Sequence, residues 1–172
     1  AMGVLGAILA GGRSSRFGTD KALHVHEGRP LIAHVRHALT AQCAEVVISG
    51  QSRGGLAGLA DRPGGGLGPM AGLCAALHHG ADRGFDLVLV APCDLLGIPA
   101  DAAVRLQPGP AVADGQWLLG LWPTKLGPML EPLLLAEGAI AARRWIEVSG
   151  AALRPVPGLR NINSLGDISI PT

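Results

Sequence analysis

Residues 4–12 read VLGAILAGG, and this stretch decides the fold. The six residues from Val4 to Leu9 form an apolar run with almost no polar interruption, which is typical of a β-strand buried on both faces. Gly11 and Gly12 follow directly and predict a loop at the carboxyl end of that strand. A strand of this kind belongs in a sheet that helices cover on both sides, so the stretch favours a layered α/β protein.

The rest of the sequence alternates predicted strands and helices, which implies parallel strands joined by right-handed crossovers. We therefore predict one domain over residues 1–172, with three α/β/α layers and a mostly parallel, Rossmann-like sheet. Strands are predicted over residues 4–9, 45–49, 86–91, 111–113 and 118–121. Helices are predicted over residues 31–41, 70–79, 99–106, 127–136 and 139–148, with a glycine-rich loop over residues 54–68.

The composition excludes several classes of protein. Of the 172 residues, 48% are hydrophobic and 16% are charged, which rules out a disordered chain. The net charge of +1 comes without a basic stripe, which argues against a nucleic-acid partner. The chain also lacks the run of about 18 apolar residues that would predict a membrane span. Cys43, Cys74 and Cys93 lie far apart without CxxC spacing, so we expect free thiols and a cytoplasmic location.

The segment from Leu9 to Lys21, LAGGRSSRFGTDK, is the strongest candidate for a binding site. Glycines after a buried strand let the backbone approach a ligand closely and point several N–H groups at a phosphate. Arg16 and Lys21 bring two cations into the same loop, which favours a polyphosphate ligand. The alternative is an ordinary strand-to-helix turn with solvated charges. The segment matches neither the P-loop pattern nor Gly-x-Gly-x-x-Gly.

Acidic and amide side chains follow or accompany the predicted strand ends, where parallel sheets bind ligands. Asp94 follows the strand predicted over residues 86–91 and suits Mg²⁺, although it is also a reasonable helix cap. Asp61 lies in the sequence Asp-Arg-Pro-Gly, which is equally an ordinary turn. Asn161 and Asn163 share one face of an extended segment, where they would line an acceptor site, complete a metal shell or simply form a turn.

Four motifs in this chain resemble, in the same order, those of the molybdenum cofactor guanylyltransferases, the MobA family. They are LAGGRSSRFGTDKAL (residues 9–23), GPMAG (68–72), PCD (92–94) and NINS (161–164). The resemblance implies transfer of GMP from Mg-GTP to the phosphate of molybdopterin, with release of pyrophosphate. By position, the resemblance implies that GTP is bound by Leu9, Ala10, Gly11, Lys21, Asp61 and Asp94. It also implies that Asp94 is a Mg²⁺ ligand.

The same resemblance extends to two more positions of the nucleotide site. Gly12 belongs to its first loop, and Ser49 stands where the family usually carries an asparagine. We expect Lys21, Arg16 and the Mg²⁺ at Asp94 to share the neutralisation of phosphate charge, without a protein general base. Asn161 and Asn163 would lie toward the acceptor.

Two alternatives remain at this point. The first is a related nucleotidyltransferase that uses another nucleotide or acceptor. The second is a non-catalytic protein that binds a nucleotide or the pterin. The expected partners are GTP and the molybdopterin cofactor, with no nucleic acid and no membrane, and a transient contact with a cofactor-delivering protein stays open. The six histidines do not predict a zinc site. We expect the three tryptophans to pack, with Trp122 as the one that would flank a planar pterin.

Overall fold

The computed structural model describes residues 3–9, 25–50 and 55–161. Within these ranges a seven-stranded sheet consists of β1 (Val4–Leu9), β4 (Glu45–Ser49), β5 (Gly58–Leu59), β6 (Leu87–Pro92), β8 (Ala111–Ala113), β9 (Gln116–Pro123) and β10 (Ala152–Arg154). The strand order is β10-β8-β9-β6-β1-β4-β5. Neighbouring strands run parallel except at β9, which is antiparallel to both β6 and β8. The predicted mostly parallel sheet is confirmed.

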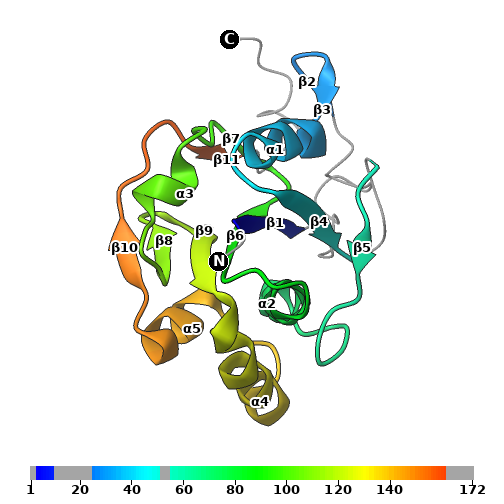
Figure 1. The fold of residues 1–172 in the computed structure, drawn as a ribbon, viewed down its shortest axis with the longest axis vertical. Coiled ribbons are helices and arrows are strands. Elements are labelled where there is room, and N and C mark those ends of the chain that lie inside the picture. The colour runs from blue at the N-terminus through cyan, green and yellow to red at the C-terminus, as the bar shows by residue number, and fades with distance from the viewer. Residues whose placement is uncertain (1–2, 10–24, 51–54, 162–172) are drawn as a thin grey trace.

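Helices cover both faces of this sheet (Figure 1). They are α1 (Leu31–Thr40), α2 (Pro69–Asp82), α3 (Ala102–Arg105), α4 (Gly127–Glu137) and α5 (Ala142–Ser149), with a 3₁₀ turn over Thr124–Leu126. One core cluster contains residues of α1 and α3, and the other contains residues of α2, α4 and α5. The protein therefore has the three layers that the sequence predicts.

Strand β1 is buried on both faces, as its apolar run predicts. Leu5, Ala7 and Leu9 belong to the cluster beneath α2, whereas Ile8 belongs to the cluster beneath α1. Alternate residues of a strand point to opposite faces, so a strand between two helical layers needs apolar residues at nearly every position. This is why the opening stretch lacks an alternating polar pattern.

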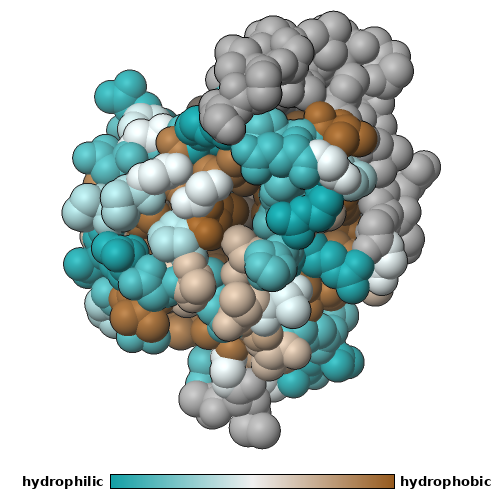
Figure 2. All heavy atoms as spheres, turned by 90° about the horizontal axis from the view of Figure 1, so that it is seen from above, coloured by the Kyte–Doolittle hydropathy of each residue, from teal (hydrophilic) through white to brown (hydrophobic). Residues whose placement is uncertain are grey.

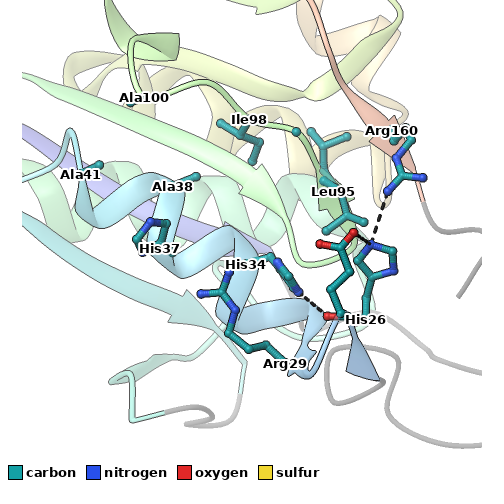
Figure 3. A pocket seen from close by; sticks show the side chains of 13 residues that line it. His26, Arg29, His34, His37, Ala38, Ala41, Leu95, Ile98, Ala100 and Arg160 are labelled. Carbon is teal, nitrogen blue, oxygen red and sulfur yellow. Dashed lines mark hydrogen bonds and ion pairs between the residues drawn. The ribbon is translucent and has the colours of Figure 1, made fainter. Parts of the chain in front are cut away.

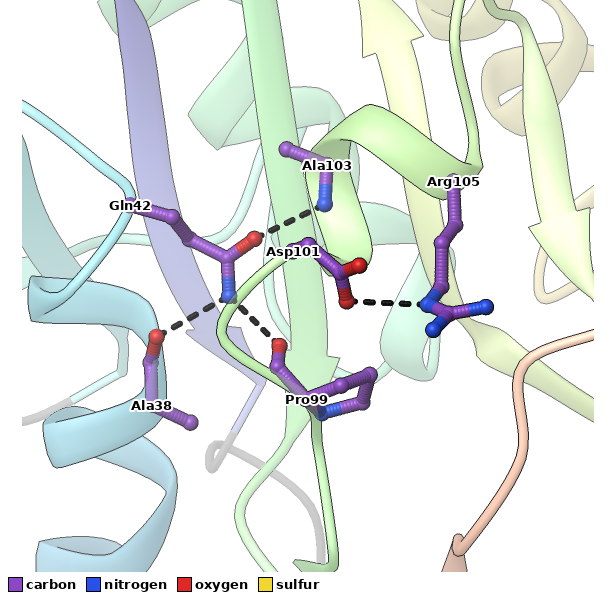
Figure 4. A network of polar contacts seen from close by, with 6 residues as sticks. All are labelled: Ala38, Gln42, Pro99, Asp101, Ala103 and Arg105. Atoms are coloured by element: carbon purple, nitrogen blue, oxygen red, sulfur yellow. Dashed lines mark hydrogen bonds and ion pairs between the residues drawn. The ribbon is translucent and has the colours of Figure 1, made fainter.

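Helix α1 begins where the sequence predicts, after Pro30, and buries Leu31, Ile32, Val35 and Leu39. Just beyond its end, the side chain of Gln42 joins three backbone segments (Figure 4). Its Nε2 donates to the carbonyls of Ala38 and Pro99, each at 3.0 Å, and its Oε1 accepts from the N–H of Ala103 at 2.8 Å. One amide thus fixes the helical layer above the sheet by joining α1 to α3.

Several short strands were not predicted. β2 (Val25–His26) and β3 (Arg29–Pro30) form a hairpin, and β7 (Leu95–Leu96) pairs with β11 (Arg160–Asn161). The two-residue strand β5 lies inside the segment that we expected to be entirely loop, and it extends the sheet beyond β4. Elements this short have no periodicity to read, and their pairing partners decide whether they form.

Two of the three tryptophans, Trp122 and Trp145, pack in the core as predicted. Trp122 is 2% exposed and packs against Trp145, with ring centroids 5.7 Å apart. Trp122 therefore belongs to the core as predicted, and its burial argues against the alternative that it flanks a pterin. Trp117 is 38% exposed, so it does not pack as predicted. The two side chains differ in exposure because of their places along β9. Trp117 is the second residue of the strand, whereas Trp122 lies within the core cluster.

The surface carries isolated hydrophobic residues among hydrophilic ones. In the view from above, teal and brown residues are interspersed over the face that includes α1 (Figure 2). Isolated exposed apolar residues are ordinary on proteins and mark no interface by themselves. Among the described residues, no helix is both long and apolar enough to cross a membrane.

Candidate active site

Four strands of the sheet end in one aligned row. Leu9 lies opposite both Pro92 and Ser49, and Ser49 lies opposite Leu59. The row therefore crosses β6, β1, β4 and β5, and spans about 14 Å because neighbouring strands lie about 4.8 Å apart. Beyond one end of this row the chain carries Asp94, and beyond the other end it carries Asp61. Parallel sheets bind ligands at the carboxyl ends of their strands, so this edge is the candidate active site.

Asp94 extends the row at the β6 end. It lies in the tight turn between β6 and β7, two residues after Pro92, and its side chain is half-buried. The N–H of Cys93 donates to the carbonyl of Leu9 at 3.2 Å, so the chain beyond β6 stays against the end of β1. The turn thus holds a carboxylate beside the strand that leads into the glycine loop.

Asn161 lies close to Asp94, although 67 positions separate them in the sequence. Asn161 is paired with Leu95 in the β7–β11 ribbon, one residue after Asp94. Its Nδ2 donates to Oε1 of Gln116 at 2.9 Å. The structure therefore brings two predicted site residues together and adds Gln116 as a residue that orients one of them. The sequence offered no signal for Gln116.

Asp61 extends the other end of the row, two residues after Leu59 of β5. Its Oδ1 is buried without a hydrogen-bond partner among the described residues, and burial raises the pKa of this carboxyl group. Such an oxygen is costly unless something pairs with it. The adjacent N–H of Arg62 donates to the carbonyl of Ala71 at 3.1 Å, which holds the Asp61 loop against α2.

The GPMAG motif forms the start of α2, and the structure explains both of its glycines. Gly68 has φ of 74°, a conformation that side chains disfavour, and Pro69 then begins the helix. At Gly72 an added Cβ would lie 2.9 Å from Oγ of Ser49 and 3.1 Å from Cδ2 of Leu9. The helix can therefore approach the strand ends only because position 72 has no side chain.

Ser49 is 5% exposed and lies beneath α2 at its contact with Gly72. The space between Ser49 and α2 is narrow and accommodates the small serine side chain, whereas an asparagine side chain is larger. Leu9 is also buried, at 8% exposed. A nucleotide contact at either residue remains a prediction. The predicted site residues Ala10, Gly11, Gly12, Arg16, Lys21 and Asn163 lie outside the described residues.

A cavity of about 320 Å³ adjoins the β7–β11 ribbon, between it, α1 and the β2–β3 hairpin (Figure 3). His26, His34, His37, Arg29 and Arg160 line it, with the carboxylate of Glu27. A guanidinium nitrogen of Arg160 lies 3.3 Å from Nε2 of His26, and Nε2 of His34 lies 2.6 Å from the carbonyl of His26. These contacts join the ribbon to the hairpin and to α1, so the residues around the cavity buttress the ribbon that carries Asn161.

The donors at this edge fit Mg²⁺. This ion takes oxygen ligands, typically one or two protein carboxylates with phosphate and water in the remaining positions. Asp94 supplies a carboxylate at the end of a central strand, and the unpaired oxygen of Asp61 lies at the far end of the same edge. Because one protein carboxylate is sufficient for such an ion, Asp94 and Asp61 need not share a metal.

Comparison with known proteins identifies the family. The profile of the MobA-like NTP transferase domain matches residues 6–156. A molybdenum cofactor guanylyltransferase of Rhodobacter capsulatus is 37% identical over 163 residues, which is 88% of this chain and 83% of that protein. Another from Cereibacter sphaeroides is 33% identical and covers 98% of this chain and 95% of that protein.

The solved structures agree on the fold. Molybdopterin-guanine dinucleotide biosynthesis protein A from Archaeoglobus fulgidus has a TM-score of 0.73 at 20% identity, over 95% of this chain and 94% of that one. A 2-C-methyl-D-erythritol 4-phosphate cytidylyltransferase from Thermus thermophilus has a TM-score of 0.63 at 16% identity, over 94% of each chain. The fold thus serves more than one nucleotide, and the sequence match decides the family. The chain belongs to the MobA-like NTP transferases and is a nucleotidyltransferase.

Proposed function

We propose that this chain transfers GMP from GTP to the phosphate of molybdopterin, giving the guanine dinucleotide cofactor and pyrophosphate. One observation carries the proposal beyond family membership. The row from Pro92 to Leu59 has Asp94 beyond one end and Asp61 beyond the other. This separation suits an extended nucleoside triphosphate, with its phosphates toward Asp94 and its nucleoside toward Asp61.

The reaction requires alignment and charge neutralisation. A phosphate oxygen of the acceptor attacks the α-phosphorus of GTP, and the bond from that phosphorus to the bridging oxygen breaks. Pyrophosphate leaves with the electron pair. The acceptor oxygen is already anionic, so no protein base is needed. Asp94 would hold Mg²⁺, which when bound offsets negative charge on the phosphates and the leaving group. Lys21 and Arg16 would contribute further positive charge.

Guanine recognition depends on acceptor groups near β1. Guanine presents N1–H and N2–H₂ donors on one edge, so its pocket needs carbonyl or carboxylate oxygens. The Leu9 carbonyl already accepts from Cys93, but a carbonyl oxygen has two lone pairs and retains capacity for another donor. Adenine offers an acceptor where guanine has N1–H, and the resulting unpaired carbonyl costs about 1–3 kcal/mol.

Mg²⁺ as the metal and the cytoplasm as the location belong to the same proposal. A reducing compartment suits Cys43, Cys74 and Cys93, none of which forms a disulfide. A brief docking with a protein that delivers the cofactor is a further part of it. Asn161, and Asn163 after it, would face the acceptor.

The direct test is to mix the protein with Mg-GTP and molybdopterin and to assay both the dinucleotide and pyrophosphate. Binding without pyrophosphate would favour the non-catalytic alternative. Calorimetry then addresses the nucleotide, and we expect Mg-GTP to bind at least about tenfold tighter than ATP or CTP, about 1.4 kcal/mol. Equal or tighter binding of CTP would overturn the guanylyltransferase assignment in favour of a related transferase.

A further inference from the structure

A cysteine, a histidine and a glutamate meet between α2 and α4. Cys74 and His78 are one helical turn apart on α2, and Glu131 comes from α4. One ligand atom from each lies within 4.8 Å of the other two. Nε2 of His78 is 3.6 Å from Oε1 of Glu131. The proposed reaction uses none of these three side chains.

We propose that Cys74, His78 and Glu131 bind a Zn²⁺ ion that clamps α2 to α4. Thiolate sulfur, imidazole nitrogen and carboxylate oxygen are the donors that zinc takes in proteins. Ligands about 2.0–2.3 Å from a tetrahedral ion lie about 3.3–3.8 Å from one another, so small side-chain rotations close the site. A water molecule would take the fourth position.

The glutamate is already oriented for this role. Its Oε2 accepts from Nε of Arg62 at 2.7 Å, and its Oε1 faces His78. The Arg62 hydrogen bond lowers the pKa of Glu131, which keeps the carboxylate ionised. Partners of this kind commonly orient metal-binding carboxylates. One oxygen is thus held by the arginine while the other remains directed at the cluster.

The imidazole of His78 has a buried nitrogen, Nε2, without a hydrogen bond to any described residue, which is unusual for a buried polar atom. Gly127 lies directly over the ring, and a Cβ there would be 3.1 Å from Nε2. The ring is therefore confined with its free nitrogen near Glu131 and Cys74, and a metal ion would satisfy that nitrogen.

The thiol of Cys74 is fully buried at the contact between the two helices. It would bind zinc as a thiolate, and its proton would pass to solvent as the Zn–S bond forms.

The neighbouring histidine provides an internal comparison. Nε2 of His79 is also buried without a partner among the described residues and lies 3.7 Å from Oε2 of Glu45. Oε1 of Glu45 accepts from Nε of Arg83 at 2.8 Å. This histidine, glutamate and arginine repeat the arrangement around His78, but within the described part of the chain no cysteine joins them. The thiol is what distinguishes a zinc site from an ordinary charged cluster.

The clamp would also reach the nucleotide side of the molecule. Glu131 holds Arg62, which follows Asp61 directly and whose N–H is bonded to the carbonyl of Ala71. Fixing Glu131 therefore fixes the loop that carries Asp61. The inference concerns stability and does not depend on which reaction the protein catalyses.

Cobalt(II) titration of the full, metal-free chain tests the proposal. A bound thiolate gives a sulfur-to-cobalt charge-transfer band in the near ultraviolet, and a tetrahedral site gives strong visible bands. We expect both bands at a stoichiometry of one, and expect zinc to displace them. At zinc about 100-fold above its Kd, the Tm should rise by at least about 5 °C.

Matched variants decide between the cluster and adventitious binding. Cys74→Ala should abolish the charge-transfer band, and His78→Gln should weaken cobalt binding at least about tenfold. The controls His79→Gln and Cys43→Ala should retain both the band and the zinc-dependent rise in Tm. Circular dichroism of each variant checks folding. The proposal fails if no cobalt binds, if the band survives Cys74→Ala in a folded protein, or if His79→Gln weakens binding as much as His78→Gln.

Discussion

The side chain of Gln116 accepts a hydrogen bond from Nδ2 of Asn161 at 2.9 Å, across the gap between β9 and β11. This contact fixes the amide of Asn161 beside the turn that carries Asp94. We therefore expect Gln116 to act as a positioning residue for the acceptor of the proposed reaction. It needs no contact with substrate for this role.

Replacing Gln116 with alanine should raise the KM for the acceptor by about 2- to 10-fold, the usual worth of one hydrogen bond. The Kd for GTP should rise less than the acceptor KM, because Asn161 adjoins only the Asp94 end of the row and the proposed nucleoside end at Asp61 lies beyond β5. Gln116→Glu keeps an accepting oxygen and should restore most of the acceptor KM. Steady-state pyrophosphate release measures both variants. A matching rise in the Kd for GTP would contradict the positioning role.

Asp94→Asn should lower kcat by at least about 100-fold, because it removes a charge that neutralises the reaction centre while keeping the shape. Circular dichroism should show an unchanged fold. Asp101→Asn is the matched control, since Asp101 lies on the surface and pairs with Arg105 four residues later. Near-normal turnover of the Asp94 variant would remove this residue from the metal site.

Asp61→Asn should raise the thermal stability of the protein and weaken its binding of GTP. Burial raises the pKa of Asp61 above its unfolded value, so the folded state binds the proton more tightly and ionisation costs stability as pH rises. The variant should therefore have a higher Tm than the parent at pH 7. This difference should shrink as the pH falls below about 4, where the unfolded carboxyl is protonated. Thermal melts across this range test the sign.

The same substitution should weaken GTP binding, because the buried oxygen would no longer be a full anion for its ligand. Calorimetry at pH 7 measures this loss. An Asp61→Asn variant with a lower Tm and unchanged GTP affinity would instead assign the carboxylate to the structure of its loop.

Gly72→Ala should destabilise the protein despite the better helix propensity of alanine. The new methyl would meet Ser49 and Leu9 at 2.9–3.1 Å, and such overpacking costs about 1–3 kcal/mol, against about 1 kcal/mol gained in the helix. Gly64→Ala is the control, because a Cβ there has nothing within 4 Å. Denaturant unfolding should show a loss only for Gly72→Ala. Equal stabilities would mean that α2 shifts freely over the strand ends.

The sequence predicts β1, β4 and α1 well because each has a continuous apolar run or a clear helical period. It fails at β5, β7 and β11, where two residues become a strand only through a partner elsewhere in the chain. Helix α2 begins within one residue of its predicted start because Gly68 and Pro69 mark that point, but it continues three residues past the predicted end, to Asp82. Strand and helix existence is thus readable locally, whereas short pairings are not.

Some residues of the candidate site can likewise be predicted from the sequence, and others cannot. Asp94 follows a strand that the sequence reveals, so its place at the carboxyl edge follows from the fold. Gln116 cannot be foreseen, because its role depends on the ribbon that brings Asn161 beside it. The cluster of Cys74 and His78 was missed for a related reason. The spacing of this pair suits one helix face, but the carboxylate arrives from a different helix.

The central place of β1 also has consequences for the growing polypeptide. Its two edges are filled by β4 and β6, and the second of these begins only at Leu87. A chain interrupted before that point would carry a hydrophobic strand with one edge unpaired, a template for association with other chains. Long-range pairing of this kind slows folding and exposes intermediates to aggregation. During synthesis, β1 must therefore remain protected until β6 has followed it.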